Sequence, residues 1–175
     1  MTTEADSLLD EQICFALYNA SRAVTARYRD LLAPIGITYP QYLVLLVLWE
    51  TGTATVSALG ARLHLDSGTL SPLLRRLEST GLVTRTRVPG DDRSVEIGLT
   101  EAGTALRERA AELPGLVCAA TGLDLDDIRV LRDQVSSLAA HVRATNSTLA
   151  GPSLPTLPSL PTDERRTSRP LSDKK

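Results

Sequence analysis

The stretch from Thr53 to Thr100 restricts the fold of this chain more than any other. Between residues 55 and 63, apolar residues recur on one helix face, which predicts a short helix. A tight turn follows at His64-Leu65, and Asp66 then offers a side-chain acceptor to the first N–H groups of a second helix. The apolar face of that second helix carries Leu70, Leu73, Leu74 and Leu77.

A β-hairpin is predicted directly after this pair of helices. Gly81 ends the second helix, because glycine tolerates the left-handed backbone found at helix ends. Two strand-like runs follow, Leu82–Val88 and Ser94–Leu99, and the turn-forming residues 89–92 (PGDD) join them. Two helices, a tight turn and a hairpin make a winged helix-turn-helix, so the predicted fold is mainly α with a small β-hairpin wing.

Duplex DNA is a partner that explains each part of this plan. A helix fits the major groove and presents the side chains near its N-terminus to base edges. The candidate contacts on the second helix are Ser67, Thr69, Ser71, Arg75 and Arg76. The hairpin adds Arg85, Arg87 and Arg93 along the phosphate backbone, with Arg93 near the tip available to a minor groove. Helix-turn-helix units also occur as structural or protein-binding modules, and the pattern alone leaves that alternative open.

The charge of the chain is compatible with DNA binding because its basic residues cluster in the predicted winged head. The whole chain of 175 residues has a formal net charge of −2. Five arginines nevertheless lie between Arg75 and Arg93, against Glu78, Asp91 and Asp92. Affinity for phosphate depends on this local footprint, so an acidic chain is no contradiction.

No targeting or metal-binding pattern stands out in the sequence. The N-terminal residues lack the basic region and apolar run of a signal peptide, and no stretch approaches the roughly 20 apolar residues of a membrane span. We therefore expect a cytoplasmic protein, in which Cys14 and Cys118 are normally reduced. The two cysteines and the two histidines, His64 and His141, lack ligand spacing, so we expect neither a metal nor a cofactor.

Apolar helices are predicted on the N-terminal side of the winged head. The first covers Leu8–Leu32, with Ser7 and Asp10 resembling a capping box, and Pro34 and Gly36 end it. A second, very apolar helix begins around Thr38–Pro40 and runs to Glu50.

Further helices are predicted after Thr100. One covers Glu101 to about Thr121 and should kink at Pro114, and the last follows the capping residue Asp124. The first helix is too long to serve the DNA-reading head alone. We therefore expect residues 8–33 and 101–145 to build a two-fold dimer, which would read a palindromic site.

The two ends of the chain differ in composition from the part between them. Residues 1–7 are expected to be a flexible N-terminus. Residues 146–175 hold five of the ten prolines and no aromatic residue, which predicts a disordered tail.

All six aromatic residues lie in the first 50 residues, around Cys14. On one helix Tyr18 and Tyr28 point within roughly 40° of Cys14, yet Tyr28 lies about 21 Å farther along the axis. Two such helices crossing antiparallel near Ser21 would place Tyr28 of one subunit beside Cys14 of the other. Core packing explains most aromatic residues, and a lone cysteine on an apolar helix is most often inert. A cysteine ringed by phenols is different, because hydroxyl donors stabilise a thiolate.

Taken together, these motifs resemble the MarR family of dimeric transcriptional regulators. The resemblance rests on the helix-turn-helix, the wing and the D-x-R-x-x-x-x-x-L-T signature formed by Asp91, Arg93, Leu99 and Thr100. Four segments are similar to the organic-hydroperoxide sensors of that family: DEQICFALYNASRAVTARYRDLL, GITYPQYLVLLVLWE, LDSGTLSPLLRRLE and DDRSVEIGLTEAG. The resemblance covers about residues 8–145 and leaves the proline-rich tail outside.

The resemblance implies roles for individual residues. Cys14 would be the thiol that reacts with an organic hydroperoxide, and Tyr18, Tyr28 and Tyr39 the phenols of its site, partly across the dimer. Cys118 would match the second cysteine of one branch and form a disulfide with Cys14, more plausibly between subunits than within one. Asp91 would support the wing. The reduced dimer would bind its operator and repress transcription until oxidation releases it.

Two other functions remain open at the level of sequence. A regulator of the same family could be released by a small phenolic ligand in the dimer crevice, with both cysteines incidental. A thiol peroxidase could use Cys14 and Cys118 as a catalytic pair, although an enzyme has no need of a complete winged head. We therefore expect a DNA-binding regulator and not an enzyme.

Overall fold

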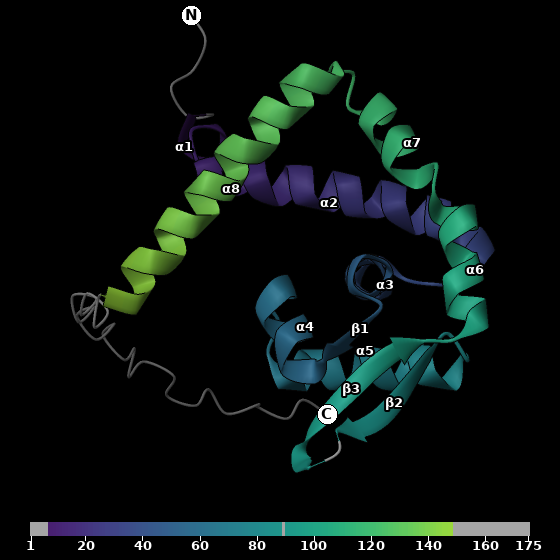
Figure 1. Ribbon diagram of the computed structural model, residues 1–175. Coiled ribbons are helices and arrows are strands. Elements are labelled where there is room, and N and C mark those ends of the chain that lie inside the picture. Colours follow the sequence, from purple (N-terminus) through teal and green to yellow (C-terminus); the bar gives the residue numbers. More distant parts are fainter. Residues whose placement is uncertain (1–6, 89, 149–175) are drawn as a thin grey trace, which may run out of the picture. The chain divides into compact units, whose positions relative to one another are not determined.

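The structure is a computed structural model that describes residues 7–88 and 90–148 (Figure 1). For residues 7, 88, 91–93 and 146–148 it describes the backbone alone. The predicted flexible N-terminus and most of the predicted tail lie outside the described residues. The chain forms two compact units, residues 1–125 and 126–175, and each is described by itself.

The predicted first helix is interrupted, so the prediction of one continuous helix from Leu8 was wrong. A short helix, α1 (Ser7–Asp10), is followed by the long helix α2 (Ile13–Leu32). Gln12 between them has extended backbone angles, φ −79° and ψ 111°, and its side chain makes no capping hydrogen bond. The apolar spacing continues across the interruption, which is why periodicity alone does not reveal it.

Helix α3 (Tyr39–Thr51) is the centre of the core and begins where predicted. Thr38 and Gln41 form a reciprocal capping box, and Pro40 occupies the first turn, where its missing N–H costs nothing. The 3-10 helix η1 (Ala33–Ile35) precedes it and ends at Gly36, whose φ of 73° requires the left-handed region. The buried residues of α3 are Gln41, Tyr42, Val44, Leu45, Val47 and Leu48.

The winged head contains the two predicted helices. They are α4 (Val56–Leu63), capped by Thr55, and α5 (Ser67–Ser79), capped by Asp66. His64 in the turn between them has a φ of 54°, a left-handed conformation that only short polar residues and glycine adopt readily. Leu70, Leu74 and Leu77 of α5 are buried as predicted.

The sheet of the head has three antiparallel strands, one more than the predicted hairpin. Strand β1 (Thr53–Thr55) was not predicted, because three residues are too few to show an alternating pattern. It pairs with β3 (Asp91–Leu99), which also pairs with β2 (Val83–Val88), giving the order β1-β3-β2. The predicted hairpin is present, but β3 begins at Asp91, three residues before the predicted start at Ser94. The strand register shifts next to Arg87 and Val88.

The helix predicted over residues 101–121 is divided into two helices. They are α6 (Glu101–Ala110) and α7 (Leu113–Ala120). The predicted kink at Pro114 was wrong. Pro114 lies in the first turn of α7, where proline is tolerated. Helix α8 (Leu125–Thr148) starts directly after Asp124, as predicted, and continues past the expected boundary at residue 145.

One hydrophobic cluster forms the core of the first unit and joins α3, α4, α5, the sheet and α6. Its fully buried members include Leu32, Leu45, Leu48, Leu59, Leu74 and Ile97. Within the described chain, no single helix is long and apolar enough to span a membrane. The pair Ile13–Ile35 and Tyr39–Thr51 meets the length and composition criteria only when taken together, across a 74° bend.

Candidate nucleic-acid interface and thiol site

The N-terminus of α5 is organised by its capping residue. Asp66 accepts hydrogen bonds from the backbone N–H of Thr69 at 2.8 Å and from the Thr69 hydroxyl at 2.9 Å. These hydrogen bonds lower the pKa of the Asp66 carboxyl, and the one from the backbone N–H has the larger effect. The Thr69 hydroxyl therefore donates within the protein and offers DNA its acceptor lone pairs, whereas Ser67 is exposed and Ser71 half-buried.

The predicted DNA-contacting arginines have different surroundings. Arg75 and Arg76 on α5 and Arg87 on β2 are exposed. Arg85 is half-buried, and its guanidinium lies 3.9 Å from the carboxylate of Glu78 on α5. Arg85 thus links the predicted recognition helix to the wing, a pairing that the sequence did not reveal. The side chains of Arg93 and Asp91 lie outside the described residues.

A small cavity of about 380 Å³ lies where the starts of α4 and α5 face β3. Hydroxyl groups from all three elements line it: Thr55, Ser57, Ser67 and Ser94. Only Ser67 was among the predicted contacts. Thr55 ends the unpredicted strand β1, Ser57 lies in α4, and Ser94 lies within β3, whose predicted bounds differed. No local signal marked these three residues as part of one surface.

The two sulfur atoms occupy different environments, and both are free thiols. Cys14 is exposed in the first turn of α2, since the helix starts at Ile13. Cys118 is partly buried in α7, which packs against α2. Among the described side chains, no group of three His, Cys, Asp or Glu residues is placed to hold a metal ion.

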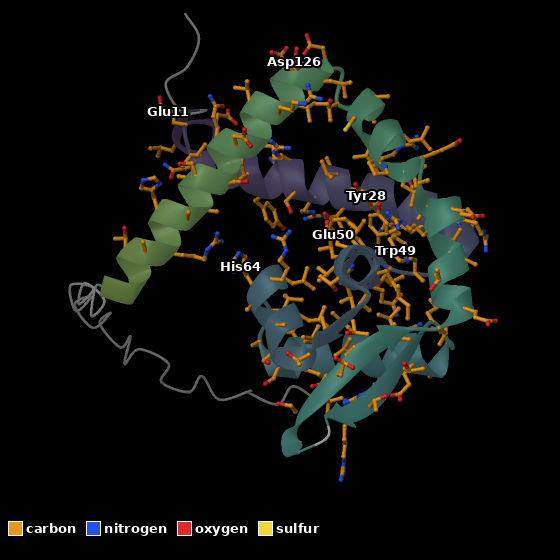
Figure 2. The ribbon with its side chains drawn as sticks, in the orientation of Figure 1. Glu11, Tyr28, Trp49, Glu50, His64 and Asp126 are labelled. Carbon is orange, nitrogen blue, oxygen red and sulfur yellow. The ribbon has the colours of Figure 1, made fainter. Side chains whose placement is uncertain are left out.

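Two of the three predicted phenols stack together near Cys118. The rings of Tyr28 and Tyr39 have centroids 4.5 Å apart, and Tyr42 lies 5.7 Å from Tyr28. Trp49 continues this row of rings at 6.0 Å from Tyr42; Tyr28 and Trp49 are labelled in Figure 2. The sequence analysis missed Tyr42, which shares a helix with Tyr39 and lies three residues from it.

Burial keeps these phenols protonated. It raises the pKa of Tyr28 to about 12, with smaller contributions from Tyr42, Tyr39 and Cys118. Burial also raises the pKa of Tyr39. The pKa of Tyr42 is raised mainly by burial, with a smaller contribution from the neighbouring Tyr39. Cys118 lies on α7, which packs against α2, the helix that carries Tyr28, and its small contribution to the raised pKa of Tyr28 agrees with this packing.

Tyr18, the third predicted phenol, stays apart from this cluster within the chain. It is 54% exposed, and its hydroxyl accepts a hydrogen bond from Arg22 at 2.9 Å. The Arg22 guanidinium carbon also lies 5.4 Å from the centre of the Tyr18 ring, a cation–π contact. One chain therefore holds Cys14 and Tyr18 on the exposed part of α2, and Tyr28, Tyr39 and Cys118 at a second location.

Comparison with known proteins assigns the chain to a family. The MarR family model matches residues 37–95, across α3, α4, α5 and most of the sheet. The organic hydroperoxide resistance transcriptional regulator of Bacillus subtilis (strain 168) is 45% identical over 138 residues, covering 79% of this chain and 94% of that protein. The chain belongs to the MarR family. It is a transcriptional regulator with the winged helix-turn-helix fold of that family.

Other relatives extend this comparison. The regulator TtmR of Methylorubrum extorquens (strain PA1) is 49% identical over 143 residues, 81% of this chain and 73% of that protein. Reduced AbfR bound to DNA has a TM-score of 0.65 and 37% identity, covering 77% of this chain and 94% of that chain. AbfR has also been solved with a disulfide formed, and that structure has a TM-score of 0.56 and 38% identity, covering 75% of this chain and 92% of that chain. A further crystal structure is of AbfR of Staphylococcus epidermidis.

Proposed function

We propose that this chain forms a homodimeric repressor that releases a palindromic operator when an organic hydroperoxide oxidises Cys14. The proposal rests on the observation that the residues of the thiol site lie at two separate places within one chain. Cys14 is exposed at one end of α2, while the phenol cluster and Cys118 lie toward the other end. A second copy of the chain would complete the site.

Exposed apolar side chains support a dimer. On α2 they include Ile13, 61% exposed, and Val24, 36% exposed. The apolar residues of α8 are exposed in the same way: Leu125, Val130, Leu131, Val135, Leu138 and Val142. Burying a side chain of this size contributes about 1.5–3 kcal/mol, so two such helices favour association with a second copy.

An antiparallel crossing of two α2 helices would bring the halves of the thiol site together. Tyr28 lies about 21 Å from Cys14 along the axis of a straight helix, too far for contact within one chain. A crossing near Ser21 would instead place Cys14 of the partner subunit beside Tyr28 and Tyr39. Cys118 lies on α7, which packs against the α2 helix of its own chain. The same crossing therefore brings the two cysteines of different subunits toward each other.

Cys14 lies in the first turn of α2, because the helix starts at Ile13 after the interruption at Gln12. In the proposed dimer, protonated phenols of the partner subunit would supply hydrogen-bond donors to the sulfur that reacts.

The chemistry then follows in two balanced steps. The Cys14 thiolate attacks the outer oxygen of the hydroperoxide, whose O–O bond breaks, giving a sulfenic acid and, after proton uptake, an alcohol. The Cys118 thiolate of the partner subunit attacks the sulfenic sulfur, forming a disulfide and releasing hydroxide, which becomes water. A disulfide needs Cα atoms within about 7 Å, so the helices must adjust to close it. Cellular thiols would reduce the bond and reset the regulator.

The head would read DNA with α5 in the major groove and the wing along the backbone. AbfR has been solved both bound to DNA in its reduced form and with a disulfide formed, which supports the same pair of states for this chain. Such a regulator would act on DNA in the cytoplasm. Oxidation would change the spacing of the two heads and so weaken binding to a two-part site.

A gel shift with the DNA upstream of the protein's own gene tests this proposal. The reduced protein should retard the DNA, and tert-butyl hydroperoxide should release it until a thiol reductant restores binding. The Cys14→Ser variant should bind equally well and resist release. Release of Cys14→Ser by a small phenol would favour the ligand-controlled alternative. Many turnovers of hydroperoxide per protein would favour a thiol peroxidase.

A further inference from the structure

A cavity of about 570 Å³ lies on the wing sheet, and none of its lining residues belongs to α5. Its lining comes from the end of α3, the three strands and α6. Ile97 is fully buried, so its neighbours on β3, Glu96 and Gly98, face the other side of the sheet, where the cavity is. A volume of this size falls within the range of small-molecule sites.

Gly98 forms the floor of this cavity. It lies in the central strand, with Thr53 of β1 and Thr84 of β2 as its register partners. A Cβ atom at residue 98 would lie 3.3 Å from the Thr84 hydroxyl oxygen and 3.6 Å from the Thr53 methyl carbon. Glycine weakens a strand interior, and at such positions it often marks a close approach of another group. Its absent side chain leaves a depression with the Thr84 hydroxyl on one side and the Thr53 methyl group on the other.

Two opposite charges line the cavity without pairing with each other. Glu96 accepts a hydrogen bond from the Thr53 hydroxyl at 3.2 Å. Arg107 on α6 makes no ion pair with any of the described residues. The carboxylate and the guanidinium therefore remain available to the two ends of a ligand that carries both charges.

An apolar wall completes the lining. It is made by Trp49 and Leu48 of α3 together with Leu99 of β3. The indole N–H of Trp49 is occupied, because it donates to the carbonyl oxygen of Gly103 at 2.9 Å. Trp49, labelled in Figure 2, can thus offer a ligand only its ring surface.

We propose that this cavity binds the zwitterion of a free amino acid with an apolar side chain. Arg107 would pair with the ligand carboxylate, Glu96 with its ammonium group, and Trp49 would pack on its side chain. The Thr84 hydroxyl beside Gly98 would add a further hydrogen bond. The bound ligand would bridge β3 and α6, and so connect the wing to the helix that follows it. This site shares no residue with the proposed thiol switch.

Isothermal titration of the full chain with L-leucine and L-phenylalanine tests the site. The Cys14→Ser background removes any effect of oxidation, so the result does not depend on the thiol switch. L-leucine and L-phenylalanine should bind saturably. N-acetyl-L-leucine, which lacks the ammonium, and L-leucinamide, which lacks the carboxylate, should each bind at least about tenfold more weakly. Arg107→Gln and Glu96→Gln should each cause a loss of similar size.

Two further variants make the assignment specific to the cavity. Glu108→Gln changes an exposed carboxylate on α6 outside the lining and should leave binding unchanged. Gly98→Ala should weaken binding while circular dichroism shows an intact fold. The proposal is overturned if neither amino acid binds at concentrations up to about 10 mM. It is also overturned if Arg107→Gln and Glu96→Gln bind like the parent protein, or if N-acetyl-L-leucine binds as tightly as L-leucine.

Discussion

Tyr28 and Tyr39 stack with ring centroids 4.5 Å apart, which joins the long helix α2 to the start of the core helix α3. Both phenols have a pKa above the ordinary value because they are partly buried. They are therefore hydrogen-bond donors at neutral pH. In the proposed dimer these donors would face the Cys14 thiolate of the partner subunit.

Removing either donor should slow the oxidation of Cys14. Tyr28→Phe and Tyr39→Phe are expected to keep the fold and operator binding, since only a hydroxyl is lost. A hydrogen bond to a charged group contributes about 1.5–3 kcal/mol, so the oxidation rate should fall roughly tenfold or more. The measurement is the rate of thiol loss under excess tert-butyl hydroperoxide.

Tyr42→Phe is the matched control for these variants, because Tyr42 belongs to the same cluster but was not assigned to the thiol site. Its oxidation rate should stay near that of the parent protein. If all three variants slow oxidation equally, the effect comes from packing of the cluster. If none does, these tyrosines serve only the core.

The raised pKa of Tyr28 predicts a loss of stability at high pH. The folded pKa is about 12, against an ordinary value of 10.0, so the unfolded chain releases this proton first as pH rises. The contribution is fully present below about pH 10 and is lost as pH rises toward 12. Because the ring is only half-buried, we expect a loss of about 1 kcal/mol from this residue.

Urea denaturation at about pH 9 and about pH 11.5 measures this effect. The Tyr28→Phe variant cannot ionise at that position and should lose less stability over the same interval. Tyr39 and Tyr42 also have raised pKa values, so the variant should still lose some. An equal loss in both proteins would show that Tyr28 ionises alike in the folded and unfolded chains.

Gly103 lies where α6 passes close to the backbone just before β2. A Cβ atom there would lie 2.0 Å from the backbone carbonyl oxygen of Leu82, which cannot move away as a flexible side chain could. Gly103→Ala should therefore lower the free energy of unfolding by at least about 2 kcal/mol. In Gly115→Ala the added methyl group meets nothing within 4 Å, so that change in α7 should be neutral or stabilise by about 0.5–1 kcal/mol. Similar urea midpoints for the two variants would contradict this assignment.

The parts of the fold that were predictable from sequence are those with local causes. The caps at Thr38 and Asp66 and the left-handed Gly36 each depend on a few neighbouring residues. The interruption at Gln12 was not predictable, because no glycine or proline lies near it and the apolar spacing continues across it. The strand β1 was not predictable, because it depends on pairing with a distant segment. A three-residue strand forms only when β3 supplies its hydrogen-bond partners.

The same distinction applies to the candidate site. The residue types around Cys14 pointed to a thiol site, and helix geometry separated Cys14 from Tyr28. The addition of Tyr42 to the phenol cluster and the pairing of Arg85 with Glu78 are contacts between elements. No spacing along the chain encodes them, so sequence patterns could not reveal them.

Operator binding should depend on Arg75 of α5 and on Arg93 of the wing. Arg75 is exposed, and its guanidinium is free to meet a base edge or a phosphate in the groove. Alanine at either position should weaken binding by about 1–3 kcal/mol, measured by fluorescence anisotropy at a fixed salt concentration. Arg129→Ala makes the same charge change in α8, outside the winged head, and should have little effect. Folded Arg75 and Arg93 variants that bind like the parent protein would remove them from the interface.

The last prediction concerns the covalent product of oxidation. On a non-reducing denaturing gel, protein treated with tert-butyl hydroperoxide should run as a dimer that a thiol reductant converts to monomer. The reason is that Cys118, in the helix α7 that packs against α2, contributes to the raised pKa of Tyr28, whereas Cys14 lies about 21 Å from Tyr28 along α2. The antiparallel crossing therefore favours a bond between subunits.

Variants of the two cysteines separate the steps. Cys14→Ser should form no dimer, because no sulfenic acid is made. Cys118→Ala should also form no dimer, yet Cys14 should still oxidise and then proceed to sulfinic acid, which cellular thiols do not reverse. Release of the operator should be weaker in Cys118→Ala than in the parent protein, because no disulfide forms to move the helices, and a thiol reductant should not reverse whatever release occurs. A treated parent protein that stays monomeric, with Cys14 and Cys118 joined in one chain by peptide mapping, would show an intrachain bond. If no link forms at all, Cys118 is a packing residue of α7, and the exposed Cys14 alone would have to carry the response.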